Sequence, residues 1–283
     1  MHRAASEIPT AGPPGISEPL IVSLRAGLPR NGGERAYNCG TVVRQFLVYD
    51  ALDTCPYLPD RLARFPLRVS ERKLRRDELD TALAEGDRRQ GVFLYRPSCP
   101  TCSACEAIRI DVQTFTPTAS LRRILARGDA RLTVRIGPAV ADEERAALYV
   151  RHKFERGLTA DGETREVDVA AYRAFLVETC CDTVEFACRA KGELVAVAVA
   201  DRGSQSLSAV YCAFAPDFPD VSLGTYSILK QIEACRTWGL RYLYLGLYVA
   251  DCRHLAYKAR FLPHERLIRG EWRRFDPPAP PAR

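Results

Sequence analysis

The chain has 283 residues, of which 47% are hydrophobic and 27% charged, with a net charge of +6. This composition is typical of a globular protein and excludes a collagen-like or fully disordered chain. The length predicts two modest domains. No apolar stretch is long enough to cross a membrane or to act as a secretory signal, so we expect a cytoplasmic protein without a membrane partner. Eleven cysteines, an odd number, fit a reducing compartment.

The first half of the chain divides into an extension and a folded unit. Residues 1–43 are rich in proline, glycine and serine without a period, which predicts a disordered extension. Residues 44–140 are expected to form a mixed domain, in which Ser120 caps the last helix. Its predicted elements are a strand at Gln45–Tyr49, a helix at Asp77–Ala84, strands at Val92–Tyr95 and Ala107–Val112, and a helix at Ser120–Ala126.

Four cysteines of this first domain are candidates for a metal site. Cys99, Cys102 and Cys105 stand three residues apart, and Cys55 lies upstream in a Cys-Pro turn. Thiolates with this spacing can converge on a zinc ion or an iron–sulfur cluster. The alternative is that the four side chains are small buried hydrophobes that pack a loop-rich domain without metal.

Positive charge is concentrated in the same half of the chain. Arg88 and Arg89 lie within the segment Gly86–Gly91, and Arg96 follows closely. A guanidinium group can bind a phosphate or a carboxylate through two parallel hydrogen bonds. A basic surface of this kind suits RNA or an acidic peptide, and the alternative is a solvated surface with nothing bound.

The second domain is predicted over residues 141–275, followed by a proline-rich disordered tail at 276–283. Val195, Val197 and Val199 alternate with alanines, which is typical of a central strand covered on both faces. The predicted elements are helices at Asp142–Phe154 and Val169–Thr179, strands at Val184–Arg189, Glu193–Asp201 and Ser206–Phe214, a long helix at Leu223–Trp238, a strand at Tyr242–Gly246, a short helix near Leu255–Arg260 and a strand near Glu265–Ile268. This order is that of an N-acetyltransferase-like (GNAT-type) acyltransferase core, and we therefore predict an α/β (α+β) fold.

Three segments of this domain are candidates for ligand contact. Ser222-Leu-Gly-Thr225 precedes the long helix, whose backbone N–H groups favour an anion, and Gly224 would admit a ligand close to the backbone. Gly246 could mark a splayed strand end, with Tyr248 stacking on the ligand. Tyr257-Lys-Ala-Arg260 places two cations on one turn, suited to an ester or to phosphates. The structural alternatives are a plain helix cap, core aromatic side chains and a solvated face.

These motifs together resemble the arginyl-tRNA–protein transferase family, and its bacterial leucyl-transferring branch matches best. The resemblance extends from about Gln45 to Trp272. The matching segments, in order, are Cys55–Leu58, Gly86–Gly91, Tyr95–Pro97, Cys99–Cys105, Arg109–Ile110, Ser120–Arg123, Gly192–Val197, Leu207–Tyr211, Ser222–Tyr226, Tyr242–Gly246 and Tyr257–Phe261.

The resemblance implies an aminoacyltransferase that moves leucine from leucyl-tRNA to the α-amine of proteins that begin with Asp or Glu, marking them for N-end rule degradation. The ester of the donor is already activated, so we expect no required cofactor and no nucleophilic cysteine. The Gly246 N–H group, the Tyr211 hydroxyl or Lys258 would stabilise the oxyanion. The acidic side chain of the acceptor is expected to meet an arginine, and the candidates in order are Arg88, Arg89 and Arg96.

Three departures from the family pattern affect the acceptor and the donor. Asp87 replaces a usual Phe, which bears on the acceptor contacts. Gly246-Leu-Tyr248 replaces a usual Gly-Tyr-Trp, and Gly157-Leu-Thr-Ala-Asp-Gly162 replaces a usual glycine-methionine segment, so the shape of the aminoacyl pocket and the choice of leucine stay open. Transfer of arginine therefore stays an alternative. An ordinary acetyl-CoA transferase is a second one, although Ser222–Tyr226 matches its glycine-rich loop poorly. A metal- or RNA-binding regulator without catalysis is a third, but it leaves the acyltransferase-like half unexplained.

Overall fold

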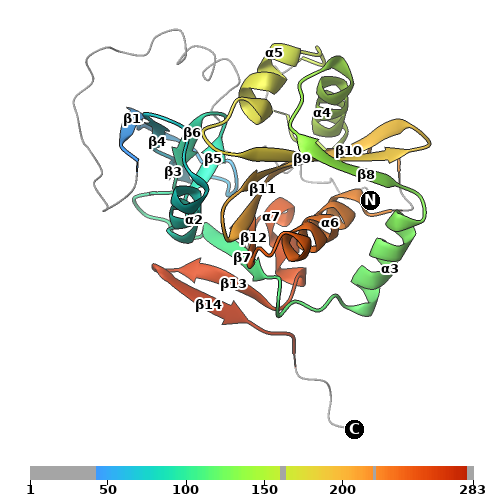
Figure 1. Ribbon diagram of the computed structural model, residues 1–283. Coiled ribbons are helices and arrows are strands. Elements are labelled where there is room, and N and C mark those ends of the chain that lie inside the picture. Colours follow the sequence, from blue (N-terminus) through green and yellow to red (C-terminus); the bar gives the residue numbers. More distant parts are fainter. Residues whose placement is uncertain (1–42, 160–163, 219–220, 279–283) are drawn as a thin grey trace, which may run out of the picture.

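A computed structural model describes residues 43–159, 164–218 and 221–278. Apart from Val43, the extension predicted at 1–43 lies outside these residues, as do residues 279–283 of the predicted tail. The described chain is a mixed α/β structure, as predicted. Helices cover both faces of its largest sheet (Figure 1).

The largest sheet has eight strands, in the order β14-β13-β7-β12-β11-β10-β9-β8. In chain order its strands are β7 (Glu106–Asp111), β8 (Thr133–Pro138), β9 (Thr183–Ala190), β10 (Glu193–Arg202), β11 (Ser206–Phe214), β12 (Tyr242–Tyr248), β13 (His264–Ile268) and β14 (Glu271–Phe275). β10 is buried from Leu194 to Asp201 and pairs with a strand on each side, which confirms the prediction of a doubly covered central strand.

Two strands of this sheet come from the segment assigned to the first domain. β7 lies between β12 and β13, and β8 forms the edge beside β9. Segments on both sides of the boundary expected near residue 140 therefore contribute strands to the same sheet.

The remaining strands belong to the amino-terminal part. One sheet has the order β1-β4-β6-β5, and the hairpin β2–β3 stands apart from it. The elements here are β1 (Gln45–Tyr49), β2 (Leu52–Thr54), β3 (Leu62–Arg64), β4 (Leu67–Ser70), α2 (Arg76–Ala84), β5 (Arg88–Gln90) and β6 (Phe93–Tyr95). The bounds of β1 are those predicted. β5 was not predicted, because its residues are polar, yet all three are buried.

The other helices are α3 (Ala119–Asp129), α4 (Glu143–Glu155), α5 (Val169–Tyr172), the π-helix η1 (Arg173–Val177), α6 (Leu223–Thr237), α7 (Arg253–Ala256) and the 3₁₀ helix η2 (Tyr257–Arg260). Two details of the predictions are wrong. The cap of α3 is Thr118, whose hydroxyl accepts a hydrogen bond from the Leu121 N–H group, and Ser120 lies inside the helix. The helix expected at 169–179 is a short α5 that continues as a π-helix.

The parallel pair β11–β12 opens along its length. Pairing covers only Ser206 to Ser208 on β11 and Tyr242 to Tyr244 on β12. Beyond Tyr244 the register of β12 with β7 shifts, and Gly246 has φ +82°, a conformation that favours glycine. The two strands therefore separate toward their carboxyl ends, and this separation positions the site.

Candidate active site

A cavity of about 530 Å³ lies where β11 and β12 separate, between the start of α6 and the α7–η2 segment. Its volume suits a small ligand or one end of a larger one. Its polar and titratable lining residues are Tyr57, His152, Arg156, Tyr211, Cys212, Ser222, Thr225, Gln231, Cys252, His254, Tyr257 and Lys258. Of the described residues that line the cavity, none is Asp or Glu. The cavity is therefore electropositive.

Lys258 supplies one charge of this cavity. Its side chain is buried, and Nζ donates a hydrogen bond to the Leu247 carbonyl oxygen at 2.6 Å. Burial, followed by the nearby Arg88 guanidinium, lowers the pKa of Lys258 to about 7. The amine therefore exchanges between its charged and neutral forms near neutral pH, so that it can donate a hydrogen bond or take up a proton.

Gly246 lies directly behind Lys258. A Cβ atom at this position would lie 3.6 Å from Lys258 Nζ. The Gly246 carbonyl accepts a hydrogen bond from Arg88 Nη2 at 2.7 Å. Two basic side chains thus hold two consecutive carbonyl groups where β12 turns, and Arg88 acts from outside the cavity rather than lining it.

Aromatic side chains form the wall opposite α6. Tyr211 on β11 lies 5.3 Å from Tyr149 and 6.2 Å from His152, measured between ring centroids. Burial lowers the pKa of His152 to about 4, so this ring is neutral near pH 7. The Tyr211 hydroxyl is therefore carried by a packed aromatic cluster that restricts its movement.

The amino terminus of α6 forms a further wall. Ser222 is the N-cap residue of α6, and its side chain makes no capping hydrogen bond. Gly224 is close to the Phe214 ring, where a Cβ atom would lie at 3.3 Å. Ser222, Gly224 and Thr225 line the cavity, beside first-turn N–H groups that a ligand can use. Their contact with a substrate stays a prediction.

The sequence did not single out Arg156, because no motif surrounds it and it only follows the end of a helix. It is exposed at the cavity rim, with Cζ 5.5 Å from the centroid of the Phe214 ring. Its charge helps to lower the pKa of both His152 and His254. Within the described part of the chain, its guanidinium pairs with no carboxylate. A cation in this position is ready to pair with a substrate.

The arginines predicted to contact the acceptor have other partners. Arg89 Nε donates to Asp201 Oδ2 at 2.7 Å, and both side chains are only 2% exposed. The prediction that Arg89 contacts substrate is wrong, because this pair holds the guanidinium inside the protein. Arg96 pairs with Asp87 and Glu85, each at 2.9 Å, on a half-buried surface.

Two other predicted residues do not line the cavity. Tyr248 lies under the guanidinium of Arg266, whose Cζ is 4.6 Å from the ring centroid. Arg260 is exposed on η2, with Cζ 5.9 Å from the Phe261 centroid. Their predicted contacts with adenosine and phosphates stay predictions.

The four predicted cysteines gather on one side of the cavity. Cys55, Cys102 and Cys105 pack with Leu58 and Val249. Burial, followed by the nearby Cys99, Cys55, Cys102 and Cys252, raises the pKa of Cys105 to about 12. Cys252 was not predicted, and it also lines the cavity.

These four cysteines are the residues predicted to hold a metal ion. Over residues 43–159, 164–218 and 221–278, no three or more His, Cys, Asp or Glu side chains have an arrangement that could hold a metal ion. The zinc or iron–sulfur site stays a prediction, with the packing of four small side chains as its alternative.

In the same described ranges, no helix has the length and apolar character needed to cross a membrane.

The element order, the opened β11–β12 pair and the cavity in that opening define an acyltransferase with an N-acetyltransferase-type core.

The chain belongs to the arginine-tRNA-protein transferase family. The model of the family's N terminus matches residues 53–123, and that of its C terminus matches residues 144–268. The aspartate/glutamate leucyltransferase of Marinobacter nauticus is 37% identical over 219 residues, covering 77% of this chain and 91% of the relative. The protein of the same name from Chromohalobacter salexigens is 39% identical over 224 residues, covering 78% and 89%.

Solved structures with a similar fold have lower sequence identity to this chain. L-PGS from Bacillus licheniformis aligns with a TM-score of 0.41 and 13% identity, over 73% of this chain and 68% of that one. A GCN5-related N-acetyltransferase from Kribbella flavida aligns with a TM-score of 0.31 and 15% identity, over 53% and 52%.

Proposed function

We propose that this protein transfers leucine from leucyl-tRNA to the α-amine of proteins that begin with Asp or Glu. Membership of the family and the leucyltransferase relatives support this proposal. Its partners are then an aminoacyl-tRNA and an acidic protein N-terminus, and its products enter N-end rule degradation.

The charge of the cavity is the observation that selects leucine over arginine. An arginyl group would bring a guanidinium beside Arg156 and Lys258, and none of the described lining residues is a carboxylate that could pair with it. An unpaired charge in such a site costs several kcal/mol. Ile228 and Leu245 line the same cavity and suit a branched apolar side chain.

The same charge selects the acceptor. Arg156 at the rim is the cation that would meet the Asp or Glu side chain, in place of Arg89. A carboxylate forms charge-assisted hydrogen bonds with a guanidinium, whereas a neutral acceptor side chain would leave Arg156 without a partner.

The reaction requires positioning and stabilisation of charge. The acceptor amine attacks the ester carbonyl, a C–N bond forms, and the bond to the terminal ribose oxygen of the tRNA breaks. The amine loses a proton and the ribose oxygen gains one. Lys258, the Gly246 N–H group and the Tyr211 hydroxyl are proposed to stabilise the oxyanion, and Ser222, Gly224 and Thr225 to hold the donor end.

The test is a direct transfer assay. Purified protein is incubated with labelled leucyl-tRNA or arginyl-tRNA and with peptides that differ only in a first residue of Asp, Glu or Ala. We expect leucine on the Asp and Glu peptides. Preference for arginyl-tRNA would overturn the donor, and transfer only from acetyl-CoA would overturn the reaction class.

A further inference from the structure

Five arginines form a strip along α3 and β8, and none of them lines the cavity or has a role in the proposed reaction. The basic strip comprises Arg122, Arg123 and Arg127 on α3, Arg131 in the next turn, and Arg135 on β8. All five are exposed. Between residues 118 and 138 the sequence contains a single carboxylate, Asp129. A solvated helix usually mixes both signs of charge, so this one-sided composition requires an explanation.

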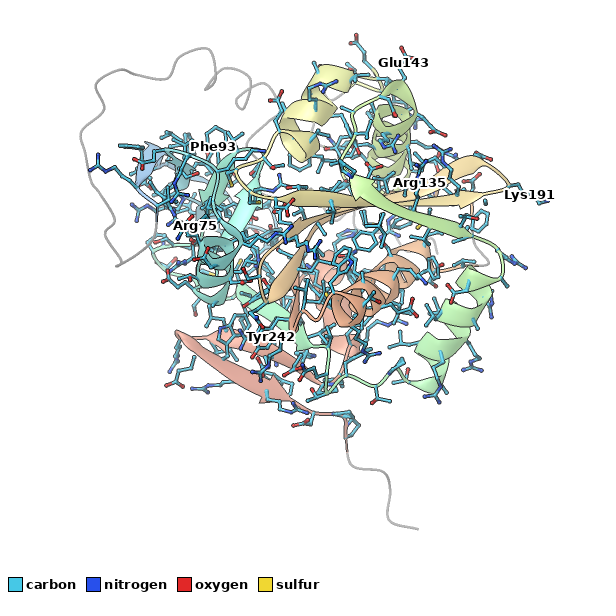
Figure 2. The ribbon with its side chains drawn as sticks, in the orientation of Figure 1. Arg75, Phe93, Arg135, Glu143, Lys191 and Tyr242 are labelled. Atoms are coloured by element: carbon cyan, nitrogen blue, oxygen red, sulfur yellow. The ribbon has the colours of Figure 1, made fainter. Side chains whose placement is uncertain are left out.

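The packing of α3 turns these side chains outward. Leu121 and Gly128 are buried, and Ile124 and Leu125 pack against the core. These positions form one helical face, and the arginines occupy the other. Arg135 lies on the edge strand β8, where Figure 2 labels it.

No carboxylate of the described chain balances the charge of three arginines in the basic strip. Arg122, Arg123 and Arg135 form no ion pair within the described part of the chain. Asp129 is already engaged, because it accepts hydrogen bonds from the Tyr226 hydroxyl at 2.9 Å and from Lys230 Nζ at 3.2 Å.

The basic strip begins next to the cavity. Gly128 packs so tightly on the Tyr226 ring that a Cβ atom would lie 2.3 Å from it. Tyr226 directly follows Thr225, which lines the cavity. Figure 1 shows α3 beside α6, on the side away from β1 to β6. An extended polyanion with one end in the cavity can therefore reach α3.

We infer that the basic strip binds the sugar–phosphate backbone of the acceptor stem of the donor tRNA; this rests on the proposed function. The donor carries its amino acid on a single-stranded 3′ end, which continues into a duplex rich in phosphates. Duplex RNA is recognised chiefly through its shape, phosphates and 2′-hydroxyls, and guanidinium groups bind phosphate well. With 11 residues, α3 extends for about 16 Å, enough to meet several phosphates.

The experiment measures tRNA binding as a function of salt for Arg123→Ala, Arg135→Ala and the double variant. Each lost phosphate contact should reduce the slope of log affinity against log salt by about one, which weakens binding about tenfold at 0.1 M salt. Arg123→Lys should keep the slope, because it keeps the charge. Arg273→Ala is the control, since β14 is the opposite edge of the sheet from β8 and Arg273 is 55% exposed.

A second arm uses 3′-O-leucyl-adenosine as donor, which is too short to reach α3. The variants should use this donor as the parent protein does, while KM for full leucyl-tRNA rises. An unchanged salt slope in both single variants would overturn the inference, as would an equal loss with the short donor. Weaker binding of the acceptor peptide with unchanged tRNA binding would assign the strip to the protein partner instead. Failure of the parent protein to transfer leucine from either donor would refute the proposed function. The salt dependence of tRNA binding would still test whether the basic strip contacts RNA.

Discussion

Replacement of Arg156 by alanine should remove the preference for acidic acceptors. Of the described residues that line the cavity, Arg156 is the one arginine, and its guanidinium pairs with no carboxylate of the described chain. The variant should retain the fold, because this side chain is exposed and contacts mainly the Phe214 ring. The expected loss is therefore in kcat/KM for peptides that begin with Asp or Glu.

The size of this loss follows from the position of Arg156. A hydrogen bond to a charged group contributes about 1.5–3 kcal/mol, and an exposed ion pair contributes up to about 1 kcal/mol. Arg156 is exposed in the free protein but would be covered by the bound acceptor, so we expect about 1.5–2 kcal/mol. This corresponds to roughly a 10- to 30-fold lower kcat/KM.

The assay is a double-mutant cycle between protein and peptide. The parent protein and Arg156→Ala are compared on peptides that begin with Asp or Asn, and the coupling energy isolates the interaction of Arg156 with the carboxylate. Arg151→Ala is the matched control, because Arg151 lies in the last turns of α4, just before Arg156, but pairs with Glu155 and Asp217. An equal loss on the Asp and Asn peptides would refute acceptor recognition by Arg156.

Three further predictions follow from buried groups. Arg89→Ala leaves Asp201 buried without its partner, so the free energy of unfolding in urea should fall by about 3–5 kcal/mol; a stable variant that specifically fails on acidic peptides would contradict this structural role. Lys258 has a pKa of about 7, so kcat/KM should fall as the pH rises past 7 and Lys258 loses its proton. Deprotonation of the acceptor amine, whose pKa is about 7.7–8.0, raises kcat/KM over a similar pH range. The two effects together predict a bell-shaped dependence of kcat/KM on pH. The Lys258→Arg variant keeps its positive charge at high pH, so the fall in kcat/KM above pH 7 should disappear. If the fall is unchanged, Lys258 is not the charged group that stabilises the oxyanion. Protein purified without oxygen should be fully active without stoichiometric zinc or iron, as metal analysis can check; a bound metal whose removal abolishes transfer would show that Cys55, Cys99, Cys102 and Cys105 are ligands.

Local sequence patterns predicted the elements that carry their own signal. β10 alternates valine and alanine without polar interruption, and α6 begins after Ser222 and ends before a glycine. The bounds of β1 and β11 agree with the structure because alternation and flanking turns mark both ends.

Only the tertiary structure determined which residues meet at the site. The sequence of β5 is typical of a charged loop, yet β5 is a buried strand. Its arginines can be buried because Arg88 donates a hydrogen bond to the Gly246 carbonyl and Arg89 pairs with Asp201. Both partners lie over 100 residues away along the chain. No local pattern encodes such pairs. The same reason explains why Arg156 was missed and Arg89 was misassigned, since neighbours in sequence do not reveal whether a guanidinium is already paired.

The sequence by itself thus determined the order of the elements between residues 141 and 268, the family and the chemical class, because these depend on local periodicity and on motifs in order. The placement of β7 between β12 and β13, the opening of β11 from β12 at Gly246 and the charge of the cavity were decided by packing. They depend on contacts between distant segments, which lower the free energy only when the whole sheet is assembled.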